Sequence, residues 1–157
     1  MKTLIIYGTK HGSTEKCSNL LKAKLQGDIV VVNIKKDLVP DINLFDNIIL
    51  GSSIYMGQIQ KEIKNFCIQS LNVLKSKKVG IFICGMNEKE VKTLFSNQFP
   101  EELVTSATAK EYFGGEFILK NMNFLERFIM KKVAKIDKDT STLSEENINK
   151  FAQLINT

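Results

Sequence analysis

Short apolar runs alternate with amphipathic stretches along this chain, which is the pattern of a parallel sheet covered by helices. Five short runs have the length of strands, and one of them, Ile29–Ile34, is rich in β-branched residues. We expect these strands at Thr3–Gly8, Ile29–Ile34, Asn47–Ser52, Lys78–Cys84 and Glu111–Phe117. Apolar residues at helical spacing predict helices at Ser13–Gln26, Gln60–Leu74, Lys89–Ser96, Asn123–Ile136 and Glu145–Ile155.

Right-handed crossovers between parallel strands leave few arrangements for these elements. We predict an α/β fold in which a doubly wound five-stranded parallel sheet, with strand order 2-1-3-4-5, carries helices on both faces. One domain is expected to span residues 1–157. Ligands bind such sheets outside the carboxyl ends of the strands, at the switch point. The candidate site therefore lies on the loops Gly8–Thr14, Ser52–Gln58 and Gly85–Asn87.

Composition and cysteine spacing exclude several kinds of site. With 157 residues, 43% of them hydrophobic, the chain can bury a core without covalent staples. Its three cysteines, Cys17, Cys67 and Cys84, are widely spaced and form no Cys-x-x-Cys pair, which is typical neither of a disulfide framework nor of a structural zinc site. His11 is the single histidine, which excludes a multi-histidine metal centre, and we expect no metal.

Charge and hydropathy bear on partners and location. The net charge is +5, yet all but one of the 22 basic residues are lysine, and proteins that read nucleic-acid bases rely on arginine. We therefore expect no nucleic-acid partner. No run approaches the roughly 20 apolar residues of a membrane span. The apolar N-terminal run reaches Gly8 too soon for a signal peptide, so a cytoplasmic protein is expected.

The loop after the first strand has the composition of an anion site. It joins a strand to a helix N-terminus, where backbone N–H groups and the helix dipole favour phosphate. Three hydroxyls can donate to phosphate oxygens, and a glycine lets the backbone approach closely. The residues of this phosphate loop are Thr9, Lys10, His11, Gly12, Ser13 and Thr14. A simpler interpretation is that Ser13 or Thr14 only caps the helix.

The other two loops are apolar where a solvent-facing edge would be polar. Ser53, Ile54, Tyr55, Met56 and Gly57 combine an aromatic ring and a thioether with small residues, which suits a flat aromatic ligand. The alternative is that Tyr55 packs on its own loop. The loop after the fourth strand would supply a third wall with Gly85, Met86 and Asn87.

These motifs resemble the flavodoxins. Residues 9–14 are similar to the flavodoxin phosphate loop, Ser/Thr-x-Thr-Gly-x-Thr, except that His11 replaces a hydroxyl residue. Met56-Gly57 resembles the flavodoxin loop whose glycine peptide turns to hydrogen-bond the reduced flavin N5. The resemblance implies a flavodoxin-like fold with FMN as cofactor, bound by the residues of the three loops. It also implies electron transfer to a redox partner protein or a quinone.

Three segments resemble a particular branch, the menaquinone-dependent protoporphyrinogen IX dehydrogenases. They are Met1–Tyr7, Gly51–Gly57 with the following Lys61, and Phe124–Lys132. The segment Met86–Lys110 is shorter than the corresponding insert of that branch. Three functions therefore stay open: an FMN electron carrier, a quinone-dependent dehydrogenase of this type, and a non-flavin anion-binding module of the same fold. We expect no catalytic acid or base.

The predicted helix Asn123–Ile136 is amphipathic and basic. Leu125, Ile129, Val133 and Ile136 line one side, and a second stripe holds Arg127, Lys131 and Lys135. The simpler interpretation is a helix packed on the core with a wet outer face. The other is weak docking on an anionic membrane or an acidic redox partner, which would place the protein peripherally at the inner membrane face.

Acidic residues are scarce near the predicted flavin site. The loop Ser52–Gln58 contains none, and Glu88 and Glu90 are the nearest carboxylates that the pattern suggests. Negative charge beside a flavin disfavours its anionic, fully reduced form. We therefore expect a second reduction potential that is less negative than in acidic flavodoxins.

Overall fold

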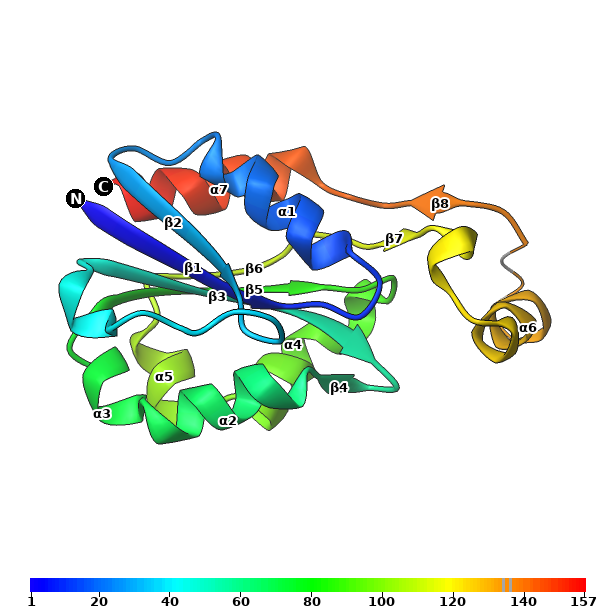
Figure 1. Cartoon of the computed structure of the whole chain (residues 1–157), viewed down its shortest axis with the longest axis horizontal. Helices are drawn as coiled ribbons and strands as arrows, with labels where there is room; N and C mark the ends of the chain where they lie inside the picture. The colour runs from blue at the N-terminus through cyan, green and yellow to red at the C-terminus, as the bar shows by residue number, and fades with distance from the viewer. Residues whose placement is uncertain (134, 136) are drawn as a thin grey trace.

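Five parallel strands form the centre of the computed structural model (Figure 1). They pair in the order β2-β1-β3-β5-β6, which confirms the predicted order. Their bounds are β1 (Lys2–Gly8), β2 (Asp28–Asn33), β3 (Asn47–Tyr55), β5 (Lys78–Cys84) and β6 (Ala109–Tyr112). The short strand β4 (Gln58–Ile59) returns antiparallel to the end of β3. The structure describes residues 1–133, 135 and 137–157, without the side chains of Glu90 and Lys92.

Helices cover both faces of this sheet (Figure 1). On one face lie α1 (Ser13–Lys22) and α7 (Glu145–Asn156), which contact each other. The other face carries α2 (Lys61–Gln69), α3 (Leu71–Leu74), α4 (Glu88–Gln98) and α5 (Glu101–Ser106), with η1 (Ile42–Leu44) before β3. No helix among the described residues is long and apolar enough to cross a membrane.

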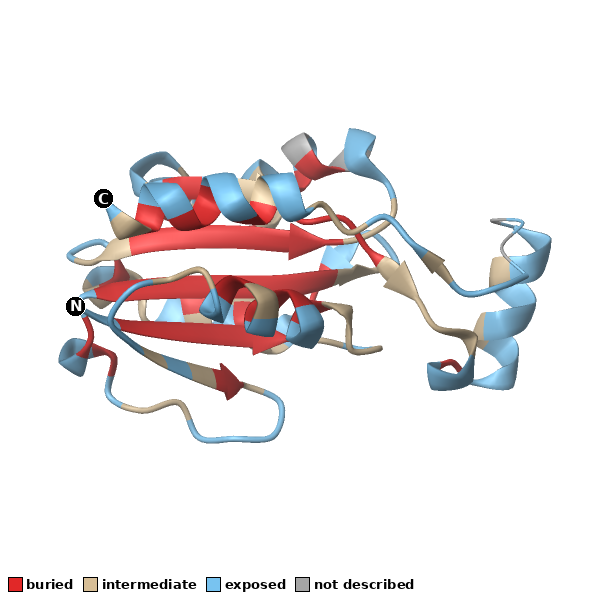
Figure 2. Ribbon diagram, turned by 90° about the horizontal axis from the view of Figure 1, so that it is seen from above, coloured by how far each residue is buried: buried red, intermediate tan, exposed pale blue. Residues whose placement is uncertain are grey.

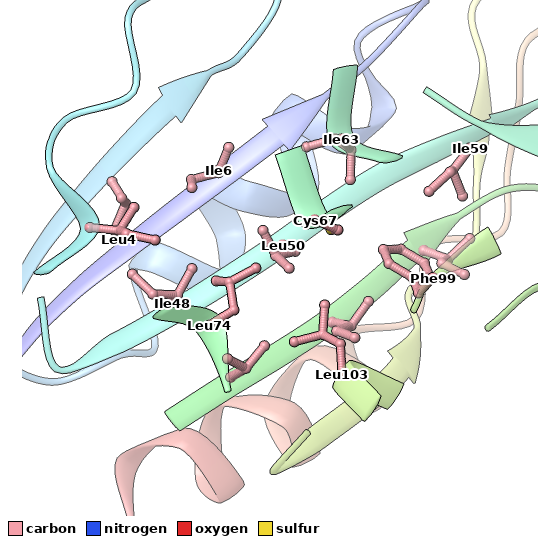
Figure 3. Close-up of a cluster of buried hydrophobic side chains, with 14 of the residues drawn as sticks. Leu4, Ile6, Ile48, Leu50, Ile59, Ile63, Cys67, Leu74, Phe99 and Leu103 are labelled. Atoms are coloured by element: carbon pink, nitrogen blue, oxygen red, sulfur yellow. The ribbon is translucent and has the colours of Figure 1, made fainter. Parts of the chain in front are cut away.

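Successive side chains of each strand enter opposite core layers, because side chains alternate between the faces of a sheet. Ile48 and Leu50 of β3 pack with the α2–α5 layer, which Figure 3 shows, whereas Ile49 packs with α1 and α7. All three side chains are fully buried. This burial on both faces explains why the strands are continuous apolar runs, and it makes the sheet a rigid base for the loops at its carboxyl edge (Figure 2).

A second structural unit leaves the core between β6 and α7. We call residues 114–142 the arm; it contains β7 (Glu116–Phe117), η2 (Leu119–Asn121), α6 (Phe124–Lys132) and β8 (Thr140–Ser141). Strands β7 and β8 pair antiparallel and form its stalk. Figures 1 and 2 show α6 at the far end, beyond the carboxyl edge of the sheet and mostly exposed.

The structure corrects several sequence predictions. The predicted strand Glu111–Phe117 is two strands in different sheets, because the chain turns at Gly114, where φ is 82°. The predicted helix Gln60–Leu74 divides at Ser70 into α2 and α3, and α5 was not predicted.

The predicted helix Asn123–Ile136 is shorter, since α6 ends at Lys132 and Lys135 is left-handed with φ of 56°; Ile136 lies outside the described residues. The prediction that this helix packs on the core is wrong. Phe124, Leu125 and Val133 are 85%, 64% and 77% exposed.

Candidate functional site

The phosphate loop leads into an uncapped helix. Gly12 is the N-cap residue of α1 with φ of 96°, and no side chain accepts a hydrogen bond from the first turn. The interpretation that Ser13 or Thr14 caps the helix is therefore wrong. The first intrahelical bond runs from the Lys16 amide to the Gly12 carbonyl. The preceding amides of the turn have no helical partner, and they present donors to an anion.

One buried hydroxyl of this loop has no partner. The Thr14 side chain is fully buried, and its Oγ1 makes no hydrogen bond within the part of the chain that the structure describes. A buried polar group without a partner is costly, so it marks a place where a ligand atom would be favourable. Thr9 has a different role: its Oγ1 accepts from the Gly12 amide at 3.0 Å and shapes the loop.

The loop after β3 is a tight hairpin rather than an open loop. Met56 and Gly57 connect Tyr55 to Gln58, which pair across the turn. Both connecting residues have positive φ, 50° and 73°, as a two-residue type I′ turn requires. A methionine in this conformation is unusual, and its side chain is 87% exposed. The hairpin thus carries a thioether at its tip.

A buried polar network fixes this hairpin to the sheet. The Gln60 amide donates to Ser52 Oγ at 2.9 Å, and the Gln60 side-chain amide donates to Ser53 Oγ at 3.1 Å. Lys35 Nζ donates to the Gln60 side-chain oxygen at 2.8 Å. All three residues 52, 53 and 60 are buried. Fully satisfied networks of this kind hold one geometry, so the hairpin is positioned before any ligand arrives.

The third loop is anchored to the start of the arm. The Gly85 amide donates to the Gly114 carbonyl at 3.0 Å, and the Tyr112 hydroxyl donates to the Gly85 carbonyl. Burial raises the pKa of Tyr112 above its ordinary value, which keeps this hydroxyl a donor. A side chain at position 115 would clash with the Gly85 carbonyl, since an added Cβ would lie 2.6 Å from its oxygen.

The three loops and the arm enclose one pocket of about 390 Å³. Ten of the fourteen predicted cofactor residues line it: Lys10, His11, Ser13, Ser53, Ile54, Tyr55, Met56, Gly85, Met86 and Asn87. The other four, Thr9, Gly12, Thr14 and Gly57, belong to the same loops but not to the pocket wall. Sequence reasoning missed the remaining lining residues: Cys84, Val91, Leu94, Gly115, Glu116, Phe117, Met122, Glu126, Ile129 and Met130.

Methionine dominates the apolar part of the wall. Of the five methionines in the chain, all except Met1 line the pocket, two from the loops and two from the arm. Thioether side chains are polarisable and adapt their shape, and they make favourable contacts with aromatic rings. The wall is therefore suited to a flat, apolar ring system.

Among the described side chains, two carboxylates face this pocket, and both come from the arm. Glu116 pairs with Lys16 at 2.7 Å, and Glu126 pairs with His11 Nε2 at 2.6 Å. The prediction from sequence considered Glu88 and Glu90 instead; Glu88 is exposed, and the side chain of Glu90 lies outside the described residues. No sequence signal indicated Glu116 or Glu126, because the arm reaches the phosphate loop only through the fold.

Tyr55 packs against the phosphate loop. Its ring lies under Lys10, whose Nζ is 3.6 Å from the ring centre, and edge-on to His11 with a centroid distance of 6.2 Å. The prediction that Tyr55 packs on its own loop is therefore not the arrangement in the structure. No group of three or more metal-ligating His, Cys, Asp or Glu side chains occurs among the described residues.

A doubly wound sheet with an uncapped helix N-terminus beside an apolar pocket at the switch point is the arrangement in which many α/β proteins hold phosphorylated ligands. The chain belongs to the flavodoxin domain family, whose model matches residues 4–144. No curated protein sequence is similar enough to this chain to count as a match.

Solved structures share the fold. A short-chain flavodoxin associated with a non-canonical PDU bacterial microcompartment has a TM-score of 0.61 and 16% identity, over 100% of this chain and 99% of that one. A WrbA-like flavodoxin from Agrobacterium tumefaciens has a TM-score of 0.57 and 16% identity, over 99% and 92%. Fusobacterium nucleatum flavodoxin bound to flavin mononucleotide has a TM-score of 0.56 and 15% identity, over 98% and 96%.

Proposed function

We propose that this protein binds FMN in the pocket described above and transfers electrons through it. The observation that carries the proposal is the phosphate loop, where an uncapped helix N-terminus lies beside the unpartnered buried hydroxyl of Thr14. Membership of the flavodoxin domain family supports the same cofactor, as does a fold neighbour that was solved with flavin mononucleotide bound.

The residues of the site fit this cofactor. The amides of the first turn of α1, with the Thr14 and Ser13 hydroxyls, would hold the phosphate, and Gly12 leaves open space, since an added Cβ would meet nothing within 4 Å. Ile54, Tyr55 and the methionines would enclose the isoalloxazine ring. When bound, FMN supplies one- and two-electron chemistry. The chain's own contribution is to orient the ring, exclude water from one side and set the surrounding charge.

The test of this proposal is a comparison of two flavins. Titration of the purified protein, followed by quenching of flavin fluorescence, should give much tighter binding of FMN than of riboflavin, because the phosphate adds charge-assisted hydrogen bonds. Thr14→Ala should weaken FMN binding more than riboflavin binding. Equal affinity for the two flavins would contradict the assignment of the phosphate loop.

A second candidate function is favoured by the arm. A carrier needs only an exposed flavin edge, whereas here Met122, Ile129 and Met130 add an apolar wall to the flavin loops. Such a wall would suit a flat apolar substrate, as in a quinone-dependent dehydrogenase of the protoporphyrinogen IX type. Turnover of protoporphyrinogen IX with a menaquinone analogue by the FMN-loaded protein would establish this activity, and its absence would leave the carrier function.

The arm also supports contact with an anionic membrane surface. The outer face of α6 carries exposed Phe124, Leu125 and Phe128. Lys131 and Lys132 are exposed on the same helix. From Ile118 to Lys138 the sequence has six basic residues and two acidic ones. Apolar side chains between lysines are the pattern of a helix that lies in a lipid interface. Such contact would bring the pocket close to a membrane-dissolved quinone.

A further inference from the structure

The arm is attached to the phosphate loop through one residue, His11. Its Nδ1 lies 3.1 Å from the Asn121 carbonyl oxygen, and its Nε2 lies 2.6 Å from the Glu126 carboxylate. The Asn121 side-chain amide donates back to the His11 carbonyl at 3.4 Å. The His11 and Glu126 side chains are only 14% and 11% exposed, so the contact between them is shielded from water, whereas Asn121 is exposed.

The two ring contacts need a charged histidine. A carbonyl oxygen and an ionised carboxylate both only accept hydrogen bonds, so both ring nitrogens must donate. This is possible when His11 is an imidazolium and impossible for either neutral tautomer. His11 was expected to contact the cofactor phosphate, but both of its ring nitrogens are occupied by the arm.

The position of the arm determines whether the pocket has an outer wall. Met122, Glu126, Ile129 and Met130 line the pocket, and they lie on the same segment that His11 holds. An ion pair also joins α1 to the arm, between Lys16 and Glu116 at 2.7 Å, and there Lys16 is half exposed. Exposed ion pairs contribute little, so the less exposed His11–Glu126 contact is the stronger of these two pairs.

We propose that His11 is a positioning residue: its imidazolium fastens the arm to the phosphate loop and thereby forms the outer wall of the pocket. Without the His11 side chain the contacts with Asn121 and Glu126 are lost, and the arm moves away from the loop. The ring of Tyr55 also lies edge-on to His11. The further statement that the arm restricts access to FMN rests on the proposed function.

The test uses the full chain without added cofactor, so its outcome is independent of flavin binding. Hydrogen–deuterium exchange of the arm, residues 116–133, is followed at one fixed pH in the wild type and in variants at His11 and Glu126.

Four variants separate the proposal from a merely structural role. His11→Asn and Glu126→Gln should each speed exchange in the arm by about tenfold or more, as expected when a charged hydrogen bond is lost. His11→Lys keeps a cation opposite Glu126, so it should restore protection. Glu146→Gln is the matched control, since it breaks the exposed pair with Lys150 at 2.9 Å on α7.

Defined results would overturn the proposal. They are unchanged exchange in both His11→Asn and Glu126→Gln, or failure of His11→Lys to restore protection. If His11→Asn does not fold, the exchange rate of the arm in Glu126→Gln alone tests the proposal. A second measurement on FMN-loaded protein should show faster FMN release in Glu126→Gln. Absence of FMN binding would contradict the proposed function and leave the exchange result standing.

Discussion

The ammonium group of Lys10 lies 3.6 Å from the centre of the Tyr55 ring. This contact joins the two halves of the site, because Lys10 belongs to the phosphate loop and Tyr55 to the hairpin that would contact a flavin ring. A cation over an aromatic face is attracted to it, and here it covers a surface that a ring system could otherwise use. A phosphate in the loop would attract the same ammonium group away from the ring.

Replacement of Lys10 should therefore affect FMN and riboflavin differently. In Lys10→Met, FMN loses a cation near its phosphate while riboflavin no longer competes with the ammonium for Tyr55. We expect the dissociation constant of riboflavin divided by that of FMN to fall by about tenfold, which corresponds to the loss of one charge-assisted contact. The control is Lys75→Met, because Lys75 is an exposed lysine between α3 and β5. An unchanged ratio in fluorescence titrations would contradict the coupling.

The charge around the pocket sets an expectation for the redox potential. The Glu116 and Glu126 carboxylates face the pocket, but Glu116 is paired with Lys16 and Glu126 with the His11 ring, so little unpaired negative charge is added. The second reduction potential of bound FMN should therefore be less negative than in acidic flavodoxins. Lys16→Gln leaves Glu116 unpaired and should lower this potential by on the order of tens of mV. Lys22→Gln, on the last turn of α1, is the control for net charge.

A redox titration followed by flavin absorbance measures the second reduction potential in the wild type and in the variants. A wild-type second potential as low as that of acidic flavodoxins would show that the paired carboxylates still act as full charges. Equal shifts in Lys16→Gln and Lys22→Gln would mean that total charge matters and the Lys16–Glu116 pair does not.

The outer face of α6 should bind anionic vesicles at low salt. Lys131→Glu with Lys132→Glu should abolish cosedimentation, and binding by the wild type should fade as the screening length falls below about 10 Å. Phe128→Ser should weaken binding even where charge is unchanged, because the apolar side chain, 52% exposed, would no longer enter the interface. Lys22→Glu with Lys75→Glu makes the same charge change elsewhere. Equal loss in both double variants would point to net charge alone.

The buried thiols make stability depend on alkaline pH. Burial raises the pKa of Cys67 to about 12, and burial beside Cys17 also raises the pKa of Cys84. A raised folded-state pKa gives stability that is complete below the unfolded value, about 8.5, and is lost as the pH rises toward the folded value. Urea unfolding should show a lower free energy at about pH 10 than at about pH 7.

Cys67→Ala tests the origin of this pH effect. The substitution leaves a small cavity and lowers stability at all pH values, but it should also reduce the decline between the two pH values by up to about 1.4 kcal/mol per pH unit. Folded wild-type protein should not react with a thiol reagent at about pH 8, since all three cysteines are buried. Fast labelling under native conditions would contradict this.

The strands could be predicted well because their pattern is local. Along Lys78–Cys84 successive side chains enter the two core layers in turn, and the predicted and observed bounds of β5 agree. Glu111–Phe117 is predicted as one strand because aromatic residues lie on both sides of Gly114-Gly115. The backbone turns at Gly114 and sends the second half to β8 instead, and the Gly-Gly dipeptide, which is typical of turns, is the local signal that this prediction overlooks.

The arm could not be predicted because its partners are distant in sequence. Asn121 and His11, which contact each other, are separated by 110 positions. The apolar side chains of α6 have the spacing of a core helix, and periodicity alone does not distinguish a helix that faces the core from one that faces a pocket on one side and solvent on the other. The loop residues were predictable, since the switch point follows from strand order alone.

The two ends of the arm meet where it leaves the core. The Ser144 amide donates to the Phe113 carbonyl at 3.0 Å, and the Thr142 amide donates to the Gly115 carbonyl at 2.8 Å. The entropy cost of closing a loop rises only slowly with its length, so the length of a segment inserted between two adjacent positions has little effect on the stability of the sheet. The residues that reach the pocket from the arm can therefore change in number and kind while the register of the sheet stays the same.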